Sequence, residues 1–180
     1  MNKIIIESER LYLTEYTNDD VQLLFQLNSD PEVLKYIGPP WTKIENAKKR
    51  IIEIIDYYSK NPGLGVWAAY EKNSNEYIGF FELAHLDKTE EIEVGYRLHK
   101  KYWGQGYATE MSKVLIDYGF NKLGLDQIVG ITHPENFASQ NVLLKCGLRY
   151  VKDAVFYGFL DKYYVIDNPK KGVKNEEVLN

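Results

Sequence analysis

The sequence predicts one α/β domain of the α+β type, with a single mixed central sheet of about seven strands flanked by helices. Two observations lead to this prediction. Segments that alternate apolar and polar residues, as strands do, are interspersed with segments whose apolar residues recur at helical spacing. The 180 residues contain no internal repeat, no low-complexity segment and no linker long enough to divide them. The expected order is βααβββαβαββ, in a domain of residues 1–167 followed by a polar, flexible tail of residues 168–180.

Local signals place the first elements. Residues 10–15 alternate as a half-buried strand does, and the polar run Asn18–Asp20 offers N-cap side chains for a helix. A short helical segment follows Pro31. The sequence Thr42–Glu45 matches a capping box, in which a hydroxyl and a carboxylate each satisfy a backbone N–H group. It predicts the start of a longer helix that extends to Tyr58.

Three strands are expected next, at residues 65–70, 77–83 and 91–98. The first two flank the turn Asn73–Asn75 as a hairpin. In the third, alternate residues are apolar and share one face, while acidic and basic residues share the other.

Glycines and turn residues delimit the remaining elements. Gly104 and Gly106 precede a helix with an apolar stripe, which ends near Gly124. The elements expected after it are a strand at 126–132, a short helix at 134–146 closed by Gly147, and final strands at 148–151, 155–160 and 163–166.

Composition and charge argue against several classes of protein. The chain has 22 Lys and Arg against 26 Asp and Glu, a formal charge of −4, so we expect no broad cationic surface for nucleic acid. The only cysteine, Cys146, cannot form an internal disulfide, which is typical of a reducing compartment. No apolar run is long enough for a membrane span or a signal peptide. We therefore expect a cytoplasmic protein with no membrane partner.

The most informative segment joins a strand end to a helix start through two glycines, Gly104 and Gly106. Such a turn exposes backbone N–H groups at the positive end of the helix dipole, where a phosphate can bind. The segment lacks the third glycine of a dinucleotide fingerprint and the lysine of a P-loop. A phosphate cradle and a plain tight connection are therefore both open interpretations at this point.

Several motifs together resemble the GCN5-related N-acetyltransferases (GNAT) and, within them, the ribosomal-protein N-terminal acetyltransferase branch, the RimJ/RimL-like proteins. Residues 103–108, Trp-Gly-Gln-Gly-Tyr-Ala, are similar to the pyrophosphate loop of that family, Gln/Arg-x-x-Gly-x-Gly/Ala, but Trp103 replaces the Gln/Arg of the first position. Residues 136–148 are similar to its Asn-x-x-Ser/Ala…Lys-x-Gly-Phe helix. The opening Arg10-Leu11-x-Leu13 and the closing residues 163–166 extend the resemblance over nearly the whole chain.

This resemblance implies a GNAT fold with two splayed parallel strands, ending at Leu98 and Thr132, and acetyl-CoA as cosubstrate without a metal. The pyrophosphate would lie on the loop backbone, and the pantetheine would pair with strand groups left open by the splay. For Asn136 a plain helix N-cap is the alternative. The implied cofactor-binding residues are Tyr96, Arg97, Leu98, Trp103, Gly104, Gln105, Gly106, Tyr107, Ala108, Thr109 and Asn136.

The resemblance also implies catalytic residues. Glu93 matches a glutamate often found in this branch and is the candidate base, although it could belong to a solvated acidic face. Leu143 stands where the family often has a tyrosine acid, so Ser139, which matches a serine of the branch, is the candidate proton donor to the thiolate. A helix cap is the alternative role of Ser139. Tyr36 and Trp41 are expected either in the substrate wall or in a packed loop.

The expected activity is direct transfer of an acetyl group, in a ternary complex, to a primary amine. The acceptor would be a protein N-terminus or a small molecule such as a polyamine or an amino-sugar antibiotic. Two alternatives stay open: a noncatalytic acyl-CoA-binding or sensor module, and a transferase for a different acyl group. Dimers are common in this branch, so a homodimer is a further expectation. The three histidines lack metal-ligand spacing, and no metal site is expected.

Overall fold

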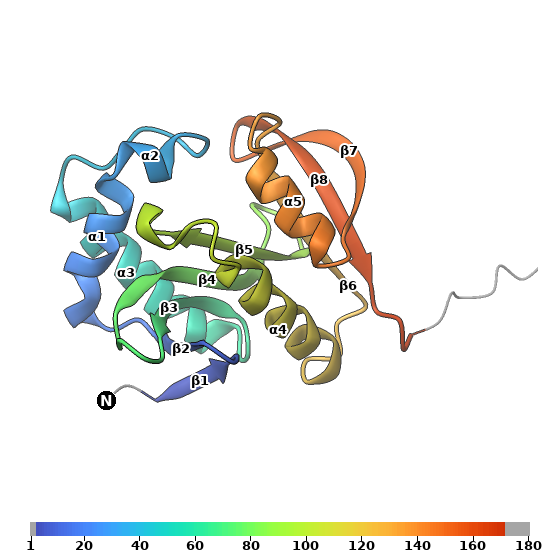
Figure 1. Ribbon diagram of the computed structural model, residues 1–180, viewed down its shortest axis with the longest axis horizontal. Coiled ribbons are helices and arrows are strands. Elements are labelled where there is room, and N and C mark those ends of the chain that lie inside the picture. Colours follow the sequence, from blue (N-terminus) through green and yellow to red (C-terminus); the bar gives the residue numbers. More distant parts are fainter. Residues whose placement is uncertain (1–2, 172–180) are drawn as a thin grey trace, which may run out of the picture.

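A computed structural model describes residues 3–171, which form one mixed sheet between two layers of helices (Figure 1). The elements are β1 (Ile4–Glu7), β2 (Leu11–Glu15), the 3₁₀ helix η1 (Asn18–Asp20), α1 (Val21–Ser29), α2 (Pro31–Leu34), α3 (Ile44–Lys60), β3 (Gly65–Glu71), β4 (Tyr77–His85), β5 (Ile92–Leu98), the 3₁₀ helix η2 (Lys100–Tyr102), α4 (Tyr107–Asn121), β6 (Gln127–Thr132), α5 (Phe137–Lys145), β7 (Arg149–Phe156) and β8 (Phe159–Asp167).

The sheet has eight strands in the order β1-β2-β3-β4-β5-β6-β8-β7. All neighbours are antiparallel except β5 and β6, which are parallel. These two strands share one registered pair, Glu93 with Val129, whereas β5 pairs with β4 along its whole length. The sheet therefore consists of two antiparallel halves, β1–β5 and β6-β8-β7, that join at one point and diverge beyond it. The predicted fold class, including its splayed parallel strands, is confirmed.

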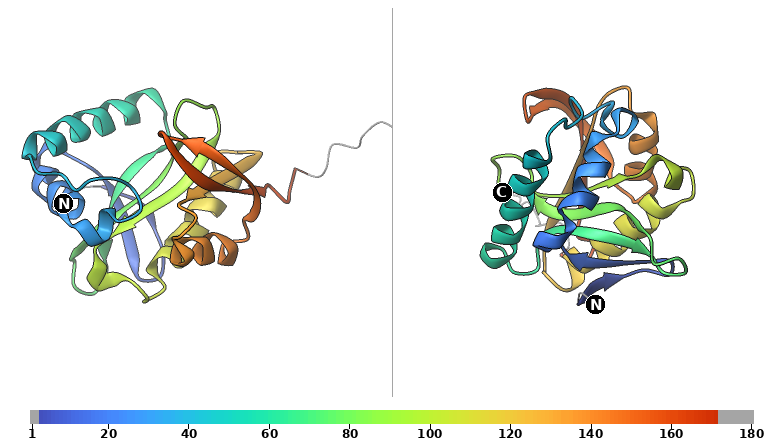
Figure 2. Two further views of the ribbon diagram at one scale, coloured as in Figure 1. Left: turned by 90° about the horizontal axis from the view of Figure 1, so that it is seen from above. Right: turned by 90° about the vertical axis from the view of Figure 1, so that its left-hand side faces the viewer.

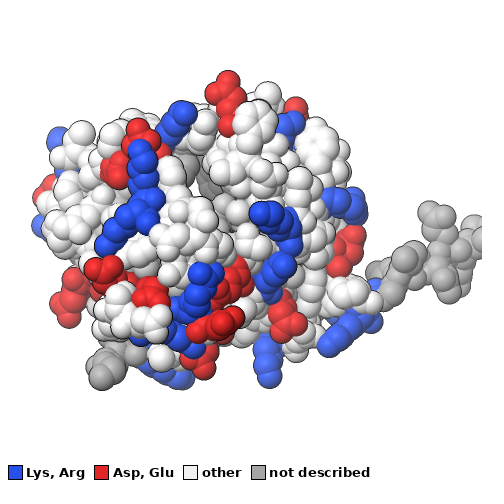
Figure 3. Space-filling model, viewed as in Figure 1, with Lys and Arg blue, Asp and Glu red and all other residues white. Residues whose placement is uncertain are grey.

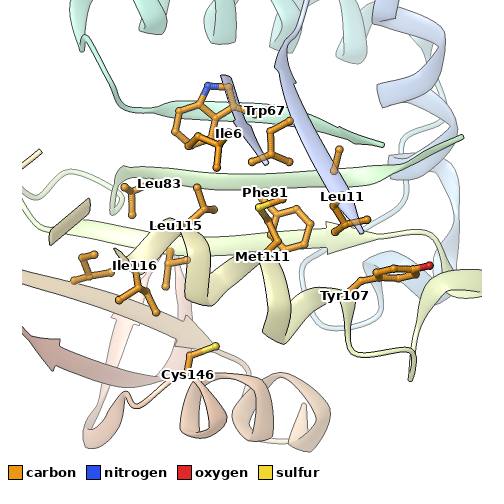
Figure 4. Packing of buried hydrophobic residues seen from close by; sticks show 14 of the residues in the cluster. Ile6, Leu11, Trp67, Phe81, Leu83, Tyr107, Met111, Leu115, Ile116 and Cys146 are labelled. Carbon is orange, nitrogen blue, oxygen red and sulfur yellow. The ribbon is translucent and has the colours of Figure 1, made fainter. Parts of the chain in front are cut away.

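Helices α1, α2 and α3 cover one face of the sheet, and α4 and α5 cover the other (Figures 1 and 2). Figure 4 shows Met111 and Leu115 of α4 pointing toward Phe81 and Leu83 of the sheet. Alternation along β5 explains the two layers, since Val94 and Tyr96 pack in the cluster under α4 while Glu93 and Arg97 face the other way. Acidic and basic side chains are interspersed on the face drawn in Figure 3.

Strand β1 was not predicted, because Ile4–Ile6 is a short apolar run without alternation. The segment 155–160, predicted as a separate strand, is wrong. Tyr157 and Gly158 have φ values of 49° and 86° and turn the chain from β7 into β8. A tight hairpin therefore replaces the middle one of the three predicted strands.

The capping box predicted at Thr42–Glu45 is also wrong. Lys43 is the N-cap of α3 and makes no side-chain cap bond, because the helix begins at Ile44, one residue too late for the box. A capping box occurs instead at Thr17, where the Asp20 carboxylate accepts from the Thr17 N–H at 2.7 Å and the Thr17 hydroxyl accepts from the Asp19 N–H at 3.3 Å.

The chain beyond β8 remains attached at Asn168, which is 6% exposed and whose side-chain amide donates to the Leu125 carbonyl at 2.8 Å. Most of the predicted tail, residues 172–180, lies outside the described residues. Within residues 3–171, no helix has the length and apolar character needed to cross a membrane.

Candidate active site

A cavity of about 490 Å³ opens where β5 and β6 diverge. Its walls include Phe80 and Arg97, which belong to the sheet face under α1 and α3. They also include Ser139 and Leu143 of α5, on the opposite face. A cavity lined from both faces passes through the sheet, and it can do so because the backbones of β5 and β6 are unpaired here.

The structure brings seven of the fifteen predicted site residues to this cavity. Leu98 is buried, and its carbonyl accepts from the Trp103 indole N–H at 2.8 Å, so it lies outside the lining. The glycine loop of residues 103–109 is also outside the lining and follows the end of β5. The predicted residues that line the cavity are Tyr36, Trp41, Glu93, Tyr96, Arg97, Asn136 and Ser139.

The loop leading into α4 has the geometry of an anion cradle. Gly104 and Gly106 have φ values of 73° and 83°, a left-handed conformation that favours glycine. Gly106 is the N-cap of α4 and supplies no side chain to cap it. Within residues 3–171, no acceptor bonds the backbone N–H groups of residues 104–109. These donors are therefore available to a phosphate at the positive end of the helix.

Arg10 and Glu110 hold this loop against the start of β2. The Arg10 Nε donates to Glu110 at 2.7 Å, and its Nη1 donates to the Gln105 carbonyl at 3.0 Å. The Ser8 hydroxyl adds a bond to Glu110 at 2.7 Å. Burial alone would raise the pKa of Glu110, but bonds from Ser8 and Arg10 outweigh it, so the pKa is lowered. Sequence reasoning placed Arg10 in a motif but missed its pairing with Glu110, which joins residues 100 positions apart.

Glu93 is 7% exposed and therefore does not belong to a solvated acidic face. Burial raises its pKa well above the usual range, and the negative charge of Glu82 raises it further. The Tyr157 hydroxyl donates to the Glu93 Oε1 at 3.0 Å and partly offsets this effect. Glu93 thus lies at the one registered pair between β5 and β6, and its burial favours the protonated form of the carboxyl group.

Tyr157 was missed because it reaches Glu93 only through the β7–β8 turn. Its own N–H donates to the Asp87 Oδ2 at 3.0 Å, and its hydroxyl oxygen accepts from the Asp87 N–H at 2.7 Å. These bonds fasten the hairpin tip to the β4–β5 connection. The only local signal is Gly158, which indicates a turn but not what the turn will contact.

Arg97 also faces the cavity, close to Glu82 and Asn28. Its Nη1 donates to the Asn28 side-chain carbonyl, and its guanidinium lies 5.2 Å from the centre of the Phe80 ring. Its Nε is buried and has no hydrogen-bond partner among the described residues. Glu82 pairs in register with Gly95, between the positions of Glu93 and Arg97. No pattern in the sequence indicated Glu82 or Asn28, because their positions in the cavity depend on the packing of α1 over β4.

Asn136 and Ser139 start α5 at the other end of the cavity. The Asn136 Oδ1 accepts from the Ser139 N–H at 3.1 Å, so the amide does act as an N-cap. Burial raises the pKa of the Tyr96 phenol, and a hydrogen bond with the Ser139 side chain partly offsets the rise. The pair Tyr96 and Ser139 therefore places two hydroxyls next to each other, while Leu143 is buried against Gly130.

Aromatic side chains close the side of the cavity under α1 and α2. Tyr36 stacks on His133 with ring centres 5.2 Å apart, and the Trp41 backbone N–H donates to the Asn28 backbone carbonyl at 2.8 Å. Cys146 is buried between α5 and α4, and burial raises the pKa of its thiol to about 11, as expected of a core cysteine. No group of three His, Cys, Asp or Glu residues in the described part of the chain could hold a metal.

Comparison with known proteins gives a consistent result. The sequence profile of the acetyltransferase (GNAT) domain matches residues 10–149. The FsC-acetyl coenzyme A-N(2)-transacetylase of Aspergillus fumigatus is 31% identical over 183 residues, covering 96% of this chain and 73% of that protein.

Several solved structures have the same fold as this chain. An acetyltransferase of the GNAT family from Bacillus anthracis superposes with a TM-score of 0.74 at 27% identity, covering 91% of this chain and 98% of that chain. RimL, a ribosomal L7/L12 alpha-N-protein acetyltransferase solved in complex with coenzyme A, gives a TM-score of 0.76 at 18% identity. That match covers 92% of this chain and 98% of the other. At such identity the likeness is one of fold, and it includes the branch that the sequence resembles.

Proposed function

The chain belongs to the GNAT family of acetyl-CoA-dependent N-acetyltransferases, and we propose that it transfers the acetyl group directly to a primary amine held in the cavity through the sheet. One observation supports direct transfer above all. The cavity passes between β5 and β6 and is lined from both faces, so a donor on one face and an acceptor on the other can meet there. No covalent relay through the protein is then needed.

The residues on the α4 side suit acetyl-CoA. Side chains at Gly104 would enter open space in front of the loop, and those at Gly106 would approach Arg10, so glycines leave room for phosphate oxygens. The free N–H groups of residues 104–109 would bind the pyrophosphate. Backbone groups of Tyr96 and Arg97 on the open side of β5 would pair with the pantetheine amides. When bound, acetyl-CoA supplies an activated thioester whose thiolate leaving group has a pKa of about 8.5.

Glu93 would act as the base for the acceptor. A lysine-like amine has a pKa of about 10.4 and is almost entirely protonated at neutral pH, so it must lose a proton before it attacks. A buried carboxylate with a raised pKa is a stronger base than an ordinary glutamate and is suited to that transfer. Tyr157 would hold its oxygen in place through the bond at 3.0 Å.

Ser139 would serve the leaving group at the opposite end. Its side chain lines the cavity beside the Tyr96 hydroxyl, so a proton can reach a departing thiolate from a hydroxyl pair. A thiolate with a pKa of about 8.5 needs only modest help. Asn136 would contribute by fixing the first turn of α5, through the bond that it makes to the Ser139 N–H.

Initial-rate kinetics with acetyl-CoA and a panel of primary amines test this proposal. The panel comprises spermidine, an amino-sugar antibiotic, peptides with free N-termini and simple amino acids. We expect an acetylated amine by mass spectrometry and intersecting double-reciprocal lines, which indicate a ternary complex. Parallel lines, or an acetylated protein intermediate, would contradict direct transfer. Failure of longer acyl-CoAs to support turnover would assign the acetyl group as the one transferred.

A further inference from the structure

The acceptor side of the cavity contains an arginine, Arg97, that has no salt-bridge contact with a described residue, although the buried Glu82 carboxylate is close enough to act on its charge. Within residues 3–171, no carboxylate lies within 4.0 Å of the Arg97 guanidinium, and its Nη1 donates to the neutral side-chain amide of Asn28. Its Nε is buried and unpartnered. Every other arginine has a carboxylate partner: Arg10 pairs with Glu110, Arg50 with Glu53, and Arg149 with Asp167. Arg97 is therefore the exception among the arginines.

A partly desolvated guanidinium without an anion in direct contact is unfavourable. Burial lowers the pKa of Arg97, which is the direction expected when a charged form loses water. Buried donors in native proteins nearly always have partners, so an orphaned one in a cavity needs an explanation. Because Nη1 donates to Asn28, the edge formed by Nε and Nη2 is the one without a partner among the described residues. That edge can bind a carboxylate through two parallel bonds.

A negatively charged residue, Glu93, lies on the same strand as Arg97. Glu93 and Arg97 are four residues apart on β5 and share the sheet face that bears Phe80 and Glu82. At about 3.3 Å per residue their Cα atoms are separated by roughly 13 Å. An acceptor amine near Glu93 and an anionic group near Arg97 would thus be joined by a spacer of several bonds. A polyamine, with cations at both ends, would instead place a positive charge against Arg97.

From these observations we propose that the acceptor carries a carboxylate as well as its amine, and that Arg97 binds this carboxylate while Glu93 faces the amine. The acceptor class is therefore an amino acid or a related amino carboxylate, with a spacer between its two charged ends. This inference rests on the proposed function, because it takes the cavity to be the acceptor site. It assigns to the Arg97 side chain a role in acceptor selection, besides the backbone contact to acetyl-CoA.

A series of ω-amino acids, from glycine to 7-aminoheptanoate, tests the inference against alkylamines of the same chain length. The wild-type kcat/KM should be at least tenfold higher for one acid than for its alkylamine, and it should peak at one spacer length. Arg97→Gln should reduce that preference at least tenfold, and Arg97→Lys should retain part of it. Arg149→Gln, which removes an exposed arginine paired with Asp167, is the matched control and should leave the ratio unchanged.

Several results would overturn the inference. Equal or better acetylation of the alkylamines by wild-type enzyme would do so without any variant. So would an Arg97→Gln enzyme that changes only the KM for acetyl-CoA, which would assign the side chain to the cosubstrate. Acetylation of spermidine or of peptide N-termini, with none of the acids acetylated, would exclude the inference and leave the proposed function intact. Absence of acetylation across acids, amines and peptides would count against both.

Discussion

The two sides of strand β5 have opposite structures. On one side, every residue of Ile92–Leu98 is in register with β4, whereas on the other only Glu93 pairs with β6. Strand β6 is likewise paired along its whole length with β8. Each edge of the gap is thus fixed by a complete antiparallel partner, so the opening can persist without collapsing. One edge of β5 is therefore part of a rigid, fully paired sheet, and the other edge is open. The proposed chemistry lies at the open edge.

The largest expected effect is that of removing the carboxylate at the open side. Glu93→Gln should lower kcat/KM by about 10²–10⁴, the usual contribution of a general base. Wild-type activity should rise with pH as Glu93 loses its proton, at a pH above the ordinary glutamate range because its pKa is raised. The variant should lack that rise. The measurement is a pH–rate profile of kcat/KM for wild type and variant.

The same substitution should lower activity but raise the stability of the fold. A folded-state pKa raised above the unfolded value, about 4.3, means that the ionised carboxylate destabilises the native state above that pH. Glutamine mimics the neutral form, so Glu93→Gln should raise Tm at neutral pH, and the difference should vanish below about pH 4. Glu90→Gln, an exposed neighbour, is the control for both measurements. An inactive variant with a lower Tm would indicate a structural role instead.

The next largest effect is expected in the glycine loop of residues 103–109, which follows β5. Gly106→Trp should weaken acetyl-CoA binding about 100-fold or more, because a bulky side chain would cover N–H donors whose bonds to a charged group contribute about 1.5–3 kcal/mol each. Isothermal titration calorimetry measures the change. Gly124→Trp is the matched control, since Gly124 follows the other end of α4 with a φ of 68° and open space around it. Equal losses in both variants would mean that strain, not the cradle, is responsible.

The paired scaffold could be predicted from the sequence, whereas much of the open site beside β5 could not. Alternation and helical spacing predict the paired scaffold because each pattern is local, and Val94 and Leu115 occupy the core as their spacing indicates. The resemblance supplied Glu93 and Ser139 as candidates. It could not supply Tyr157, Glu82 or the unpaired edge of Arg97, since these depend on a hairpin and a helix that approach β5 from distant parts of the chain.

A smaller effect is expected from the hydroxyl that contacts Glu93. Tyr157→Phe removes a donor that lowers the pKa of Glu93, so that pKa should rise further and the rising limb of the pH–rate profile should move to higher pH by up to about one unit. Activity near neutral pH would fall by up to about tenfold. Tyr163→Phe is the control, because its hydroxyl donates to Glu91, which lies just before β5. A profile lowered uniformly, without displacement, would contradict the proposed effect on Glu93.

The smallest effect concerns the contact that fixes the loop to the paired half of the sheet. The pKa of Glu110 is lowered, so its carboxylate stabilises the fold above the unfolded pKa, about 4.3, and this stability is lost as pH falls through the lower folded value. Glu110→Gln should reduce stability by about 1–2 kcal/mol at pH 7, a Tm decrease of about 2–8 °C.

This difference between wild type and Glu110→Gln should shrink as the pH falls below about 4, because the wild-type carboxylate then becomes neutral as well. Glu53→Gln provides the comparison, since Glu53 pairs with Arg50 at 3.4 Å but on the exposed surface of α3, where such pairs contribute little. A Tm decrease for Glu110→Gln that is independent of pH would mean that shape, and not charge, holds the loop. If the Tm decrease depends on pH as expected for the Glu110 charge, the ion pair with Arg10 fixes the glycine loop to the β1–β5 half of the sheet. The proposed phosphate site would then have a fixed position beside the gap.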